Sequence, residues 1–213
     1  MAYQYANFPS STPLPTPSAE GNVTITTTSV TDIWRKPPSI DSFNAPIIYK
    51  KITISKFKSA RVTVTANLKT LYDQGGLVLV FPTKRSDPRP EKRWVKTGFE
   101  YYQNRPMMST VTTDLWSDWS LLPLDPEDER EKRVTVEVER EKESDGSWGS
   151  VLRVSVVGRG GKVPVREVTW AFWDVDEEGE MWVGMTAAKP ITSEGDDELS
   201  VEFEGFEVAL RDD

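Results

Sequence analysis

The sequence of 213 residues contains neither cysteine nor histidine. Without cysteine the chain cannot form disulfide bonds or thiolate metal sites, which fits a reducing compartment. Without histidine it cannot assemble a Ser-His-Asp triad or the usual zinc sites, so we expect no bound metal and no cofactor. Any catalysis would have to use carboxylates, lysine, tyrosine or a metal supplied from outside.

Basic residues are outnumbered by acidic ones. The chain has 26 lysine and arginine residues against 34 aspartate and glutamate residues, which gives a net charge of −8. This charge opposes nucleic-acid binding, and no basic stripe offsets it. No apolar run approaches the ~20 residues of a membrane span, and the N-terminus lacks the basic and apolar segments of a secretory signal. We therefore expect no nucleic-acid or membrane partner, and a cytoplasmic or nucleocytoplasmic location.

Long apolar repeats of helical period are also missing. Short runs instead alternate apolar and polar residues, as at 61–66, 134–139 and 151–156, which is typical of β-strands. The run "GLVLVF" at 76–81 is apolar on both faces, as in a central, covered strand. Because turn signals such as Asp145-Gly146 separate these runs, the sequence predicts an all-β, two-sheet antiparallel sandwich.

Two features outside the regular runs define the ends of the domain. Residues 1–21 are rich in proline, serine and threonine, which predicts a flexible N-terminal segment before a single sandwich domain over 22–213. Near the C-terminus the parity of the apolar residues switches at Glu204-Gly205. A β-bulge at that point would keep both halves of the last strand facing the core.

The stretch "RWVKTGFEYY", residues 93–102, is the most informative strand for function. Its odd-numbered residues from Val95 to Tyr101 suit a core, whereas Trp94, Lys96, Gly98 and Glu100 share the other face. At a rise of about 3.3 Å per residue, Lys96 and Glu100 lie ~13 Å apart along the strand. We therefore expect each to find its partner on a neighbouring strand or on a ligand, with Gly98 leaving a gap for that ligand.

Similar side chains occur elsewhere in the chain. "LYDQGG" at 71–76, "WSDWS" at 116–120 and "WAFWD" at 170–174 combine aromatic, acidic and amide groups. We predict that one groove gathers the ligand-binding residues Tyr72, Gln74, Trp94, Lys96, Glu100, Asp118, Trp119 and Trp173. The alternative is that the charged residues form cross-strand ion pairs on a sheet surface, and that most tryptophans, Trp34 among them, pack at the core or at loop edges.

The order of several segments is also recognisable. Its most specific part is Tyr-Asp-Gln-Gly-Gly at 72–76, Trp-Val-Lys-x-Gly-x-Glu at 94–100 and Ser-Asp-Trp-Ser at 117–120. Together with "SFNAPIIYKKI", "VREVTWAFWD" and "VEFEGFEV", this order resembles the regulation-of-enolase protein family over residues 30–210. The resemblance implies a concanavalin A-like jelly-roll sandwich, of the lectin and glucanase superfamily, with one curved sheet lining a concave groove. It implies no settled reaction.

One spacing typical of concanavalin A-like glycosidases occurs but does not fit. Glu194, Asp196 and Glu198 match Glu-x-Asp-x-Glu, yet Gly195 and Asp197 stand where a buried strand would carry apolar residues. Retaining hydrolysis also needs two carboxyl groups held ~5–5.5 Å apart. We therefore interpret this segment as a solvated turn.

Three functions fit these observations. The first is a non-catalytic binding or regulatory protein whose groove holds a carbohydrate-like or small polar ligand, linked to carbohydrate metabolism and to a protein partner such as a metabolic enzyme. The second is a carbohydrate-active hydrolase or lyase, with Glu100 and Asp118 as acid and base and Lys96 stabilising charge. The third is a protein-interaction scaffold that uses sheet edges or the proline-rich segment. The sequence favours the first, because aromatic and polar residues cluster without a clear acid/base pair.

Overall fold

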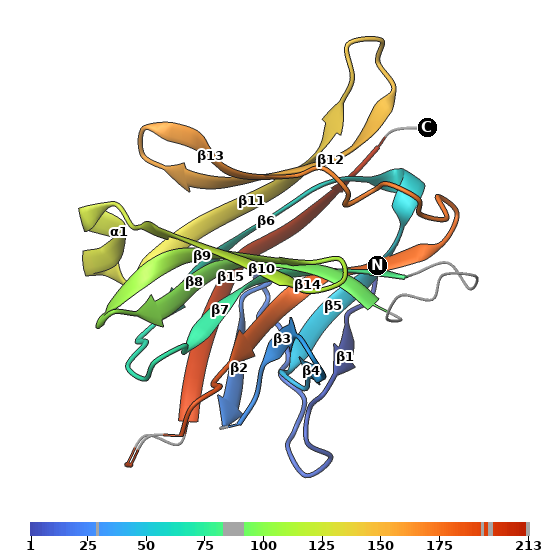
Figure 1. Ribbon diagram of the computed structural model, residues 1–213. Helices are drawn as coiled ribbons and strands as arrows, with labels where there is room; N and C mark the ends of the chain where they lie inside the picture. The colour runs from blue at the N-terminus through green and yellow to red at the C-terminus, as the bar shows by residue number, and fades with distance from the viewer. Residues whose placement is uncertain (29, 83–91, 193, 196–197, 212–213) are drawn as a thin grey trace.

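Two packed β-sheets form most of the protein (Figure 1). The computed structural model describes residues 1–28, 30–82, 92–192, 194–195 and 198–211. The strand order across the seven-stranded sheet is β1 (Gln4–Ala6), β5 (Ile47–Thr53), β14 (Glu180–Ala188), β7 (Gln74–Pro82), β8 (Lys92–Tyr102), β9 (Arg105–Thr113) and β10 (Ser117–Pro123). The order across the six-stranded sheet is β13 (Gly161–Val168), β12 (Trp148–Gly158), β11 (Arg133–Lys142), β6 (Phe57–Ala66), β15 (Glu198–Leu210) and β2 (Val23–Thr28).

Three smaller elements complete the chain. A two-stranded hairpin, β3 (Ile33–Lys36) with β4 (Ile40–Phe43), lies outside the two main sheets, and we call it the covering hairpin. The described helices are the short 3₁₀ segment η1 (Ile54–Lys56) and α1 (Pro126–Glu131), and none in the described part of the chain is long and apolar enough to cross a membrane. Neighbouring strands in each main sheet run antiparallel, so the predicted all-β sandwich is confirmed.

Alternating valines build the core between the sheets. On β6 and β11 the buried positions include Val62, Val64, Val134 and Val136, which face Val95 and other side chains from the seven-stranded sheet. Burying one such side chain contributes roughly 1.5–3 kcal/mol relative to leaving it in water. Strand β7 is buried on both faces, as the apolar run at 76–81 predicts.

The predicted bulge near the C-terminus is present. The register of β15 against β6 shifts between Glu204 and Glu207, and Gly205 takes a φ of +60°. A φ in this left-handed region costs glycine little, because it has no Cβ. As a result, Phe203 and Phe206 are both buried although they are three positions apart, a spacing that would put them on opposite faces of a regular strand.

The N-terminal segment is not entirely the flexible lead-in that we expected. Gln4–Ala6 forms β1 and pairs with β5 at the edge of the seven-stranded sheet, and the Tyr5 hydroxyl donates to the Pro15 carbonyl oxygen at 3.0 Å. Tyr3, Tyr5 and Phe8 pack against the core. These aromatic residues among the prolines supply the apolar contact that attaches the segment.

A second apolar cluster lies on the face of the seven-stranded sheet that points away from the six-stranded sheet, which we call the outer face. Val78, Val80 and Trp94 lie there with Ile33 of the covering hairpin. The hairpin therefore covers one part of the outer face and leaves an adjoining part uncovered.

Candidate ligand pocket on the outer face

A pocket of about 360 Å³ opens between the outer face and the covering hairpin. We call it the outer pocket, and its lining consists of Asp32, Trp34, Lys36, Ile40, Tyr72, Gln74, Lys96, Glu100, Val111, Trp119, Pro190 and Ile191. The volume falls within the range of about 300–1,000 Å³ that is usual for small-molecule sites. Strands of the sheet supply its floor, and the covering hairpin supplies one wall.

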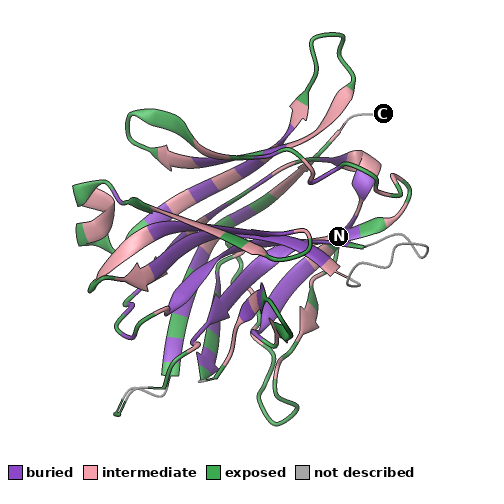
Figure 2. Ribbon diagram, in the orientation of Figure 1, coloured by how far each residue is buried: buried purple, intermediate pink, exposed green. Residues whose placement is uncertain are grey.

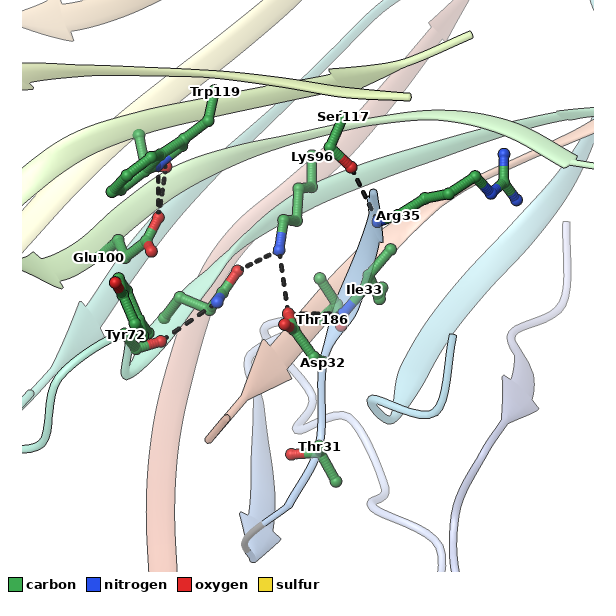
Figure 3. A network of polar contacts seen from close by, with 12 residues as sticks. Thr31, Asp32, Ile33, Arg35, Tyr72, Lys96, Glu100, Ser117, Trp119 and Thr186 are labelled. Atoms are coloured by element: carbon green, nitrogen blue, oxygen red, sulfur yellow. Dashed lines mark hydrogen bonds and ion pairs between the residues drawn. The ribbon is translucent and has the colours of Figure 1, made fainter. Parts of the chain in front are cut away.

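Lys96 connects the floor of this pocket to that wall. Its Nζ donates to Gln74 Oε1 at 2.6 Å and to Asp32 Oδ1 at 3.3 Å (Figure 3). Gln74 in turn donates from Nε2 to the Tyr72 carbonyl oxygen at 3.1 Å. Because Lys96 is 7% exposed and carries a charge, these partners offset much of the cost of removing it from water.

Glu100 forms a second polar group in the same pocket. Its Oε2 accepts hydrogen bonds from Ser109 Oγ at 2.6 Å and from Trp119 Nε1 at 3.1 Å (Figure 3). Burial raises the pKa of Glu100, whereas the charge of Lys96 and the two hydrogen bonds act in the opposite direction. Glu100 can therefore keep its proton at a higher pH than an exposed glutamate does.

The partners of Lys96 and Glu100 agree with the prediction from strand spacing. Within the described part of the chain no ion pair joins the two residues, and each is bonded to side chains from other elements. Gln74 belongs to β7, Ser109 to β9 and Trp119 to β10.

Aromatic rings surround the Glu100 end of the pocket. The ring of Trp119 meets Tyr102 edge to face at a centroid distance of 5.1 Å and Tyr72 at 6.1 Å. Tyr72 and Tyr102 stack at 6.1 Å. These mutual contacts fix the rings in place, and Trp34 adds a further aromatic side chain from the covering hairpin.

Lys189 contacts two of the segments that border the outer pocket. Its side chain is fully buried, and Nζ lies 3.1 Å from both Asp73 Oδ1 and Thr70 Oγ1, beside the turn that carries Tyr72 and Gln74. Its main chain accepts from the Thr31 amide at 3.1 Å and donates to Thr31 Oγ1 at 3.0 Å, next to Asp32. One residue thus connects the segments that supply the two oxygen partners of Lys96.

Among the described residues no group of three or more acidic side chains could hold a metal ion. The charged groups of the pocket are instead two cations and two carboxyls, Lys36, Lys96, Asp32 and Glu100. Such a set can donate and accept hydrogen bonds on several sides of a polar ligand.

Residues 10–210 match the family described as "Protein of unknown function (DUF1349)". The chain belongs to the DUF1349 family. It is 42% identical over 182 residues to "Uncharacterized protein AN7484" of Emericella nidulans, covering 85% of this chain and 83% of that protein. It is 33% identical over 100 residues to "Regulation of enolase protein 1" of Saccharomyces cerevisiae, covering 47% of this chain and 46% of that protein. The resemblance to regulation-of-enolase proteins is therefore confirmed.

Two solved structures place the DUF1349 chain among known folds. A functionally unknown protein from Saccharomyces cerevisiae matches with a TM-score of 0.73 at 24% identity, covering 98% of this chain and 96% of that one. An alginate lyase from Pseudomonas aeruginosa matches with a TM-score of 0.58 at 9% identity, covering 96% and 88%. At these identities the similarity shows the fold alone, and that fold is the concanavalin A-like jelly roll.

The outer pocket of this DUF1349 protein brings together five of the predicted ligand-binding residues. They are Tyr72, Gln74, Lys96, Glu100 and Trp119. They come from β7, β8, β10 and the turn before β7. Convergence on one face was a hypothesis from the sequence, and these five residues do share a pocket.

Three predicted residues lie elsewhere. Trp94 points to the outer face but is fully buried in the cluster beneath the covering hairpin. Asp118 precedes Trp119 on β10, so its side chain points to the opposite face, where it pairs with Arg166 of β13. Trp173 lies in a turn after β13, is 69% exposed, and accepts from Arg93 through its carbonyl oxygen.

Gly98 does not leave the gap that we expected. A Cβ at this position would lie 2.0 Å from the Gly75 carbonyl oxygen and 2.5 Å from Gly76 Cα. The glycine is therefore needed for the close approach of β7 and β8, and the opening that Gly98 lines has a volume of only about 20 Å³.

The wall formed by the covering hairpin was not predicted from the sequence. Asp32, Trp34 and Lys36 line the pocket, and they alternate with Ile33 and Arg35, which are buried. Asp32, Trp34 and Lys36 thus place an anion, an aromatic ring and a cation at even-numbered positions, as Trp94, Lys96 and Glu100 do within residues 94–100. This strand could have been predicted from the sequence, because Pro37 and Pro38 mark a turn directly after it.

The Glu194-x-Asp196-x-Glu198 spacing cannot be placed as a unit. Asp196 lies outside the described residues, and Glu198 is the first residue of β15, exposed at the end of the six-stranded sheet.

Proposed function

We propose that this protein is a non-catalytic binding and regulatory protein whose outer pocket holds a carbohydrate-like or other small polar ligand. One observation carries the proposal: aromatic side chains and charged hydrogen-bonding groups line the same pocket. Sugars present apolar C–H faces between hydroxyl groups. Trp34 and Trp119 offer aromatic surface to such faces, while Lys96 and Glu100 offer partners to the hydroxyls.

The regulatory part of the proposal is supported by the yeast relative. The name of that relative, "Regulation of enolase protein 1", connects it to a metabolic enzyme. For this chain we propose a protein partner of the same kind, and a cytoplasmic location, which a sequence without cysteine fits.

A second candidate is a carbohydrate-active hydrolase or lyase that uses Glu100 as its acid. The raised pKa of Glu100 favours it, because a general acid must hold its proton near the working pH. Two observations favour binding instead. Asp118, the expected second carboxylate, points to the other face of β10, and Asp32 is paired with Lys96. Glycoside hydrolysis usually needs two carboxyl groups beside the bond that breaks.

A glycan array followed by thermal-shift measurements with the hits tests the proposal. We expect a hit to raise the melting temperature of the wild type and of Trp173→Ala, whose tryptophan lies outside the pocket. The same hit should bind Trp34→Ala at least tenfold more weakly. Melting curves without ligand check that both variants fold.

Product analysis on the same hits distinguishes the two candidates. Binding without turnover supports the proposed function. Turnover that is lost in Glu100→Gln would establish the enzyme instead. An array without any hit, on folded wild-type protein, would contradict a carbohydrate-binding pocket.

A further inference from the structure

A second large opening lies at one corner of the sandwich, between the edges of the two main sheets. The hairpin of β12 and β13 extends over α1 there (Figure 1), and much of its surface is half-buried or exposed (Figure 2). A cleft of about 600 Å³ occupies this corner. We call it the corner cleft. It lies on the opposite face of β9 and β10 from the outer pocket, because Leu122 faces it while Trp119 faces the pocket.

Apolar side chains form the inside of the corner cleft. They are Met108, Leu122, Leu124, Val156, Val163 and Val165. Met108 and Leu124 belong to the buried core between the sheets, so the cleft is continuous with that core. Leu122 is 43% exposed and Val163 is 59% exposed. Exposed apolar side chains that line such a cleft gain free energy when a partner covers them.

The walls of the corner cleft are edge strands. Among the described strands, β10 pairs with β9 alone and β13 with β12 alone, so each has one side without a neighbouring strand. The ion pair between Arg166 and Asp118 connects the two edges at one point. Beyond that point the edges offer backbone groups to an extended peptide, which is a common way in which sheets bind short segments.

The rim of the corner cleft is acidic. Asp125, Glu127 and Asp128 lie along it, and burial together with the neighbouring carboxylates raises the pKa of Asp128. Arg159 also lies at the rim, but it pairs with Glu127 and Glu131 of α1. Because Glu127 is also paired with Arg130, the negative charge left at the rim is that of Asp125 and Asp128, for which the described residues supply no ion pair, and these two attract positive charge. A second copy of this chain, with its net charge of −8, is poorly matched to it.

We propose that the corner cleft binds a partner protein through an extended segment in which apolar side chains alternate with or adjoin lysine and arginine. The apolar side chains would cover Leu122 and Val163, and the basic side chains would meet the acidic rim. This interaction surface is separate from the outer pocket and does not depend on the function proposed for that pocket.

Selection from a phage-displayed peptide library tests the proposal with the full chain. We expect the enriched peptides to share apolar positions flanked by lysine or arginine. A synthetic peptide of the enriched sequence should bind Val163→Glu and Asp128→Lys at least tenfold more weakly than the wild type in fluorescence anisotropy. Glu178→Lys is the matched control, since it changes charge equally on an exposed loop and should bind like the wild type.

Further measurements keep the proposal falsifiable. Val163→Ser removes apolar surface without adding charge and should also weaken binding, while Trp173→Ala, whose exposed side chain lines neither opening, should leave it unchanged. Enriched peptides without basic residues, or binding that Val163→Glu leaves intact, would overturn the proposal. Sedimentation that shows a dimer of the wild type and a monomer of Val163→Glu would also overturn it, because the occupant would then be a second copy.

Discussion

Lys189 and Asp73 form an ion pair that is out of contact with solvent. Nζ and Oδ1 lie 3.1 Å apart, and the side chains are 0% and 2% exposed. Asp73 Oδ2 also accepts from the amides of Lys69 and Thr70, at 3.1 and 2.9 Å. Because both charges are buried and well bonded, the loss of one of them leaves the other without compensation.

Replacement of Lys189 by methionine should therefore destabilise the protein severely. We expect Lys189→Met to lower the free energy of unfolding by about 3–5 kcal/mol, measured by urea denaturation. Lys51→Met is the matched control, because the Lys51–Glu180 pair is exposed to solvent and its loss should change the free energy of unfolding far less. Equal, small losses in the two variants would contradict a structural role for Lys189.

A methyl group at Gly98 should disrupt the contact between β7 and β8. The new Cβ would approach backbone atoms at 2.0 and 2.5 Å, and backbone cannot move aside as a flexible side chain can. We expect Gly98→Ala to cost at least about 3 kcal/mol in urea denaturation, at the upper end of overpacking effects. Gly160→Ala is the control, since among the described atoms none lies within 4 Å of its Cβ, and its unfolding should change by less than about 1 kcal/mol.

Removal of the Lys96 charge should shift the titration of Glu100. Burial raises the pKa of this carboxyl and Lys96 partly offsets the effect, so Lys96→Met should raise the pKa further. The measurement is a pH titration of the side-chain carboxyl carbon by NMR. Lys51→Met should leave this titration unchanged, and a fall of the Glu100 pKa in Lys96→Met would disprove the assignment.

The stability of the protein should depend on pH through Glu100. Its pKa is higher in the folded state than the usual value of about 4.3. Below that value both states hold the proton. As pH rises through the folded pKa, ionisation in the buried site destabilises the folded protein. Relative to the wild type, Glu100→Gln should therefore gain stability as pH rises from about 4.3 to the pKa of Glu100 in the folded state. The gain should be at most about 1.4 kcal/mol per pH unit.

Urea denaturation of the two proteins at a series of pH values from 3 to 9 checks this expectation. Comparison of the two removes the contribution of the other acidic groups, which they share. A difference that stays constant with pH, or changes in the opposite direction, would show that the pKa of Glu100 is not raised by folding.

Much of the fold could be predicted because β-structure leaves local patterns. Alternation at Val134 and Val136 identified a strand, and the parity switch at Glu204-Gly205 identified the bulge. The attachment of residues 4–6 to β5 was not predictable in this way, since proline composition is a local signal and strand pairing over more than forty residues is not.

The residues of the candidate site could be predicted only where alternation along a single strand decides which side of the sheet a side chain points to. Strand parity placed Lys96 and Glu100 together on the outer face. Strand parity did not place Asp118, because the sequence does not show which face of β10 points toward the outer pocket. It did not place Trp173 either, because residues 169–174 form turns rather than a strand. It also could not show that the covering hairpin buries Trp94, which depends on contacts between distant segments.

The covering hairpin has a consequence for how this protein could acquire new specificity. The floor of the outer pocket belongs to paired strands whose backbones meet closely at Gly76 and Gly98, so that part of the sheet admits no added side chain. The wall is two short strands that pair with each other, and Asp32, Trp34 and Lys36 project from it. Substitutions in this short segment can therefore change the lining of the outer pocket while the sandwich stays as it is.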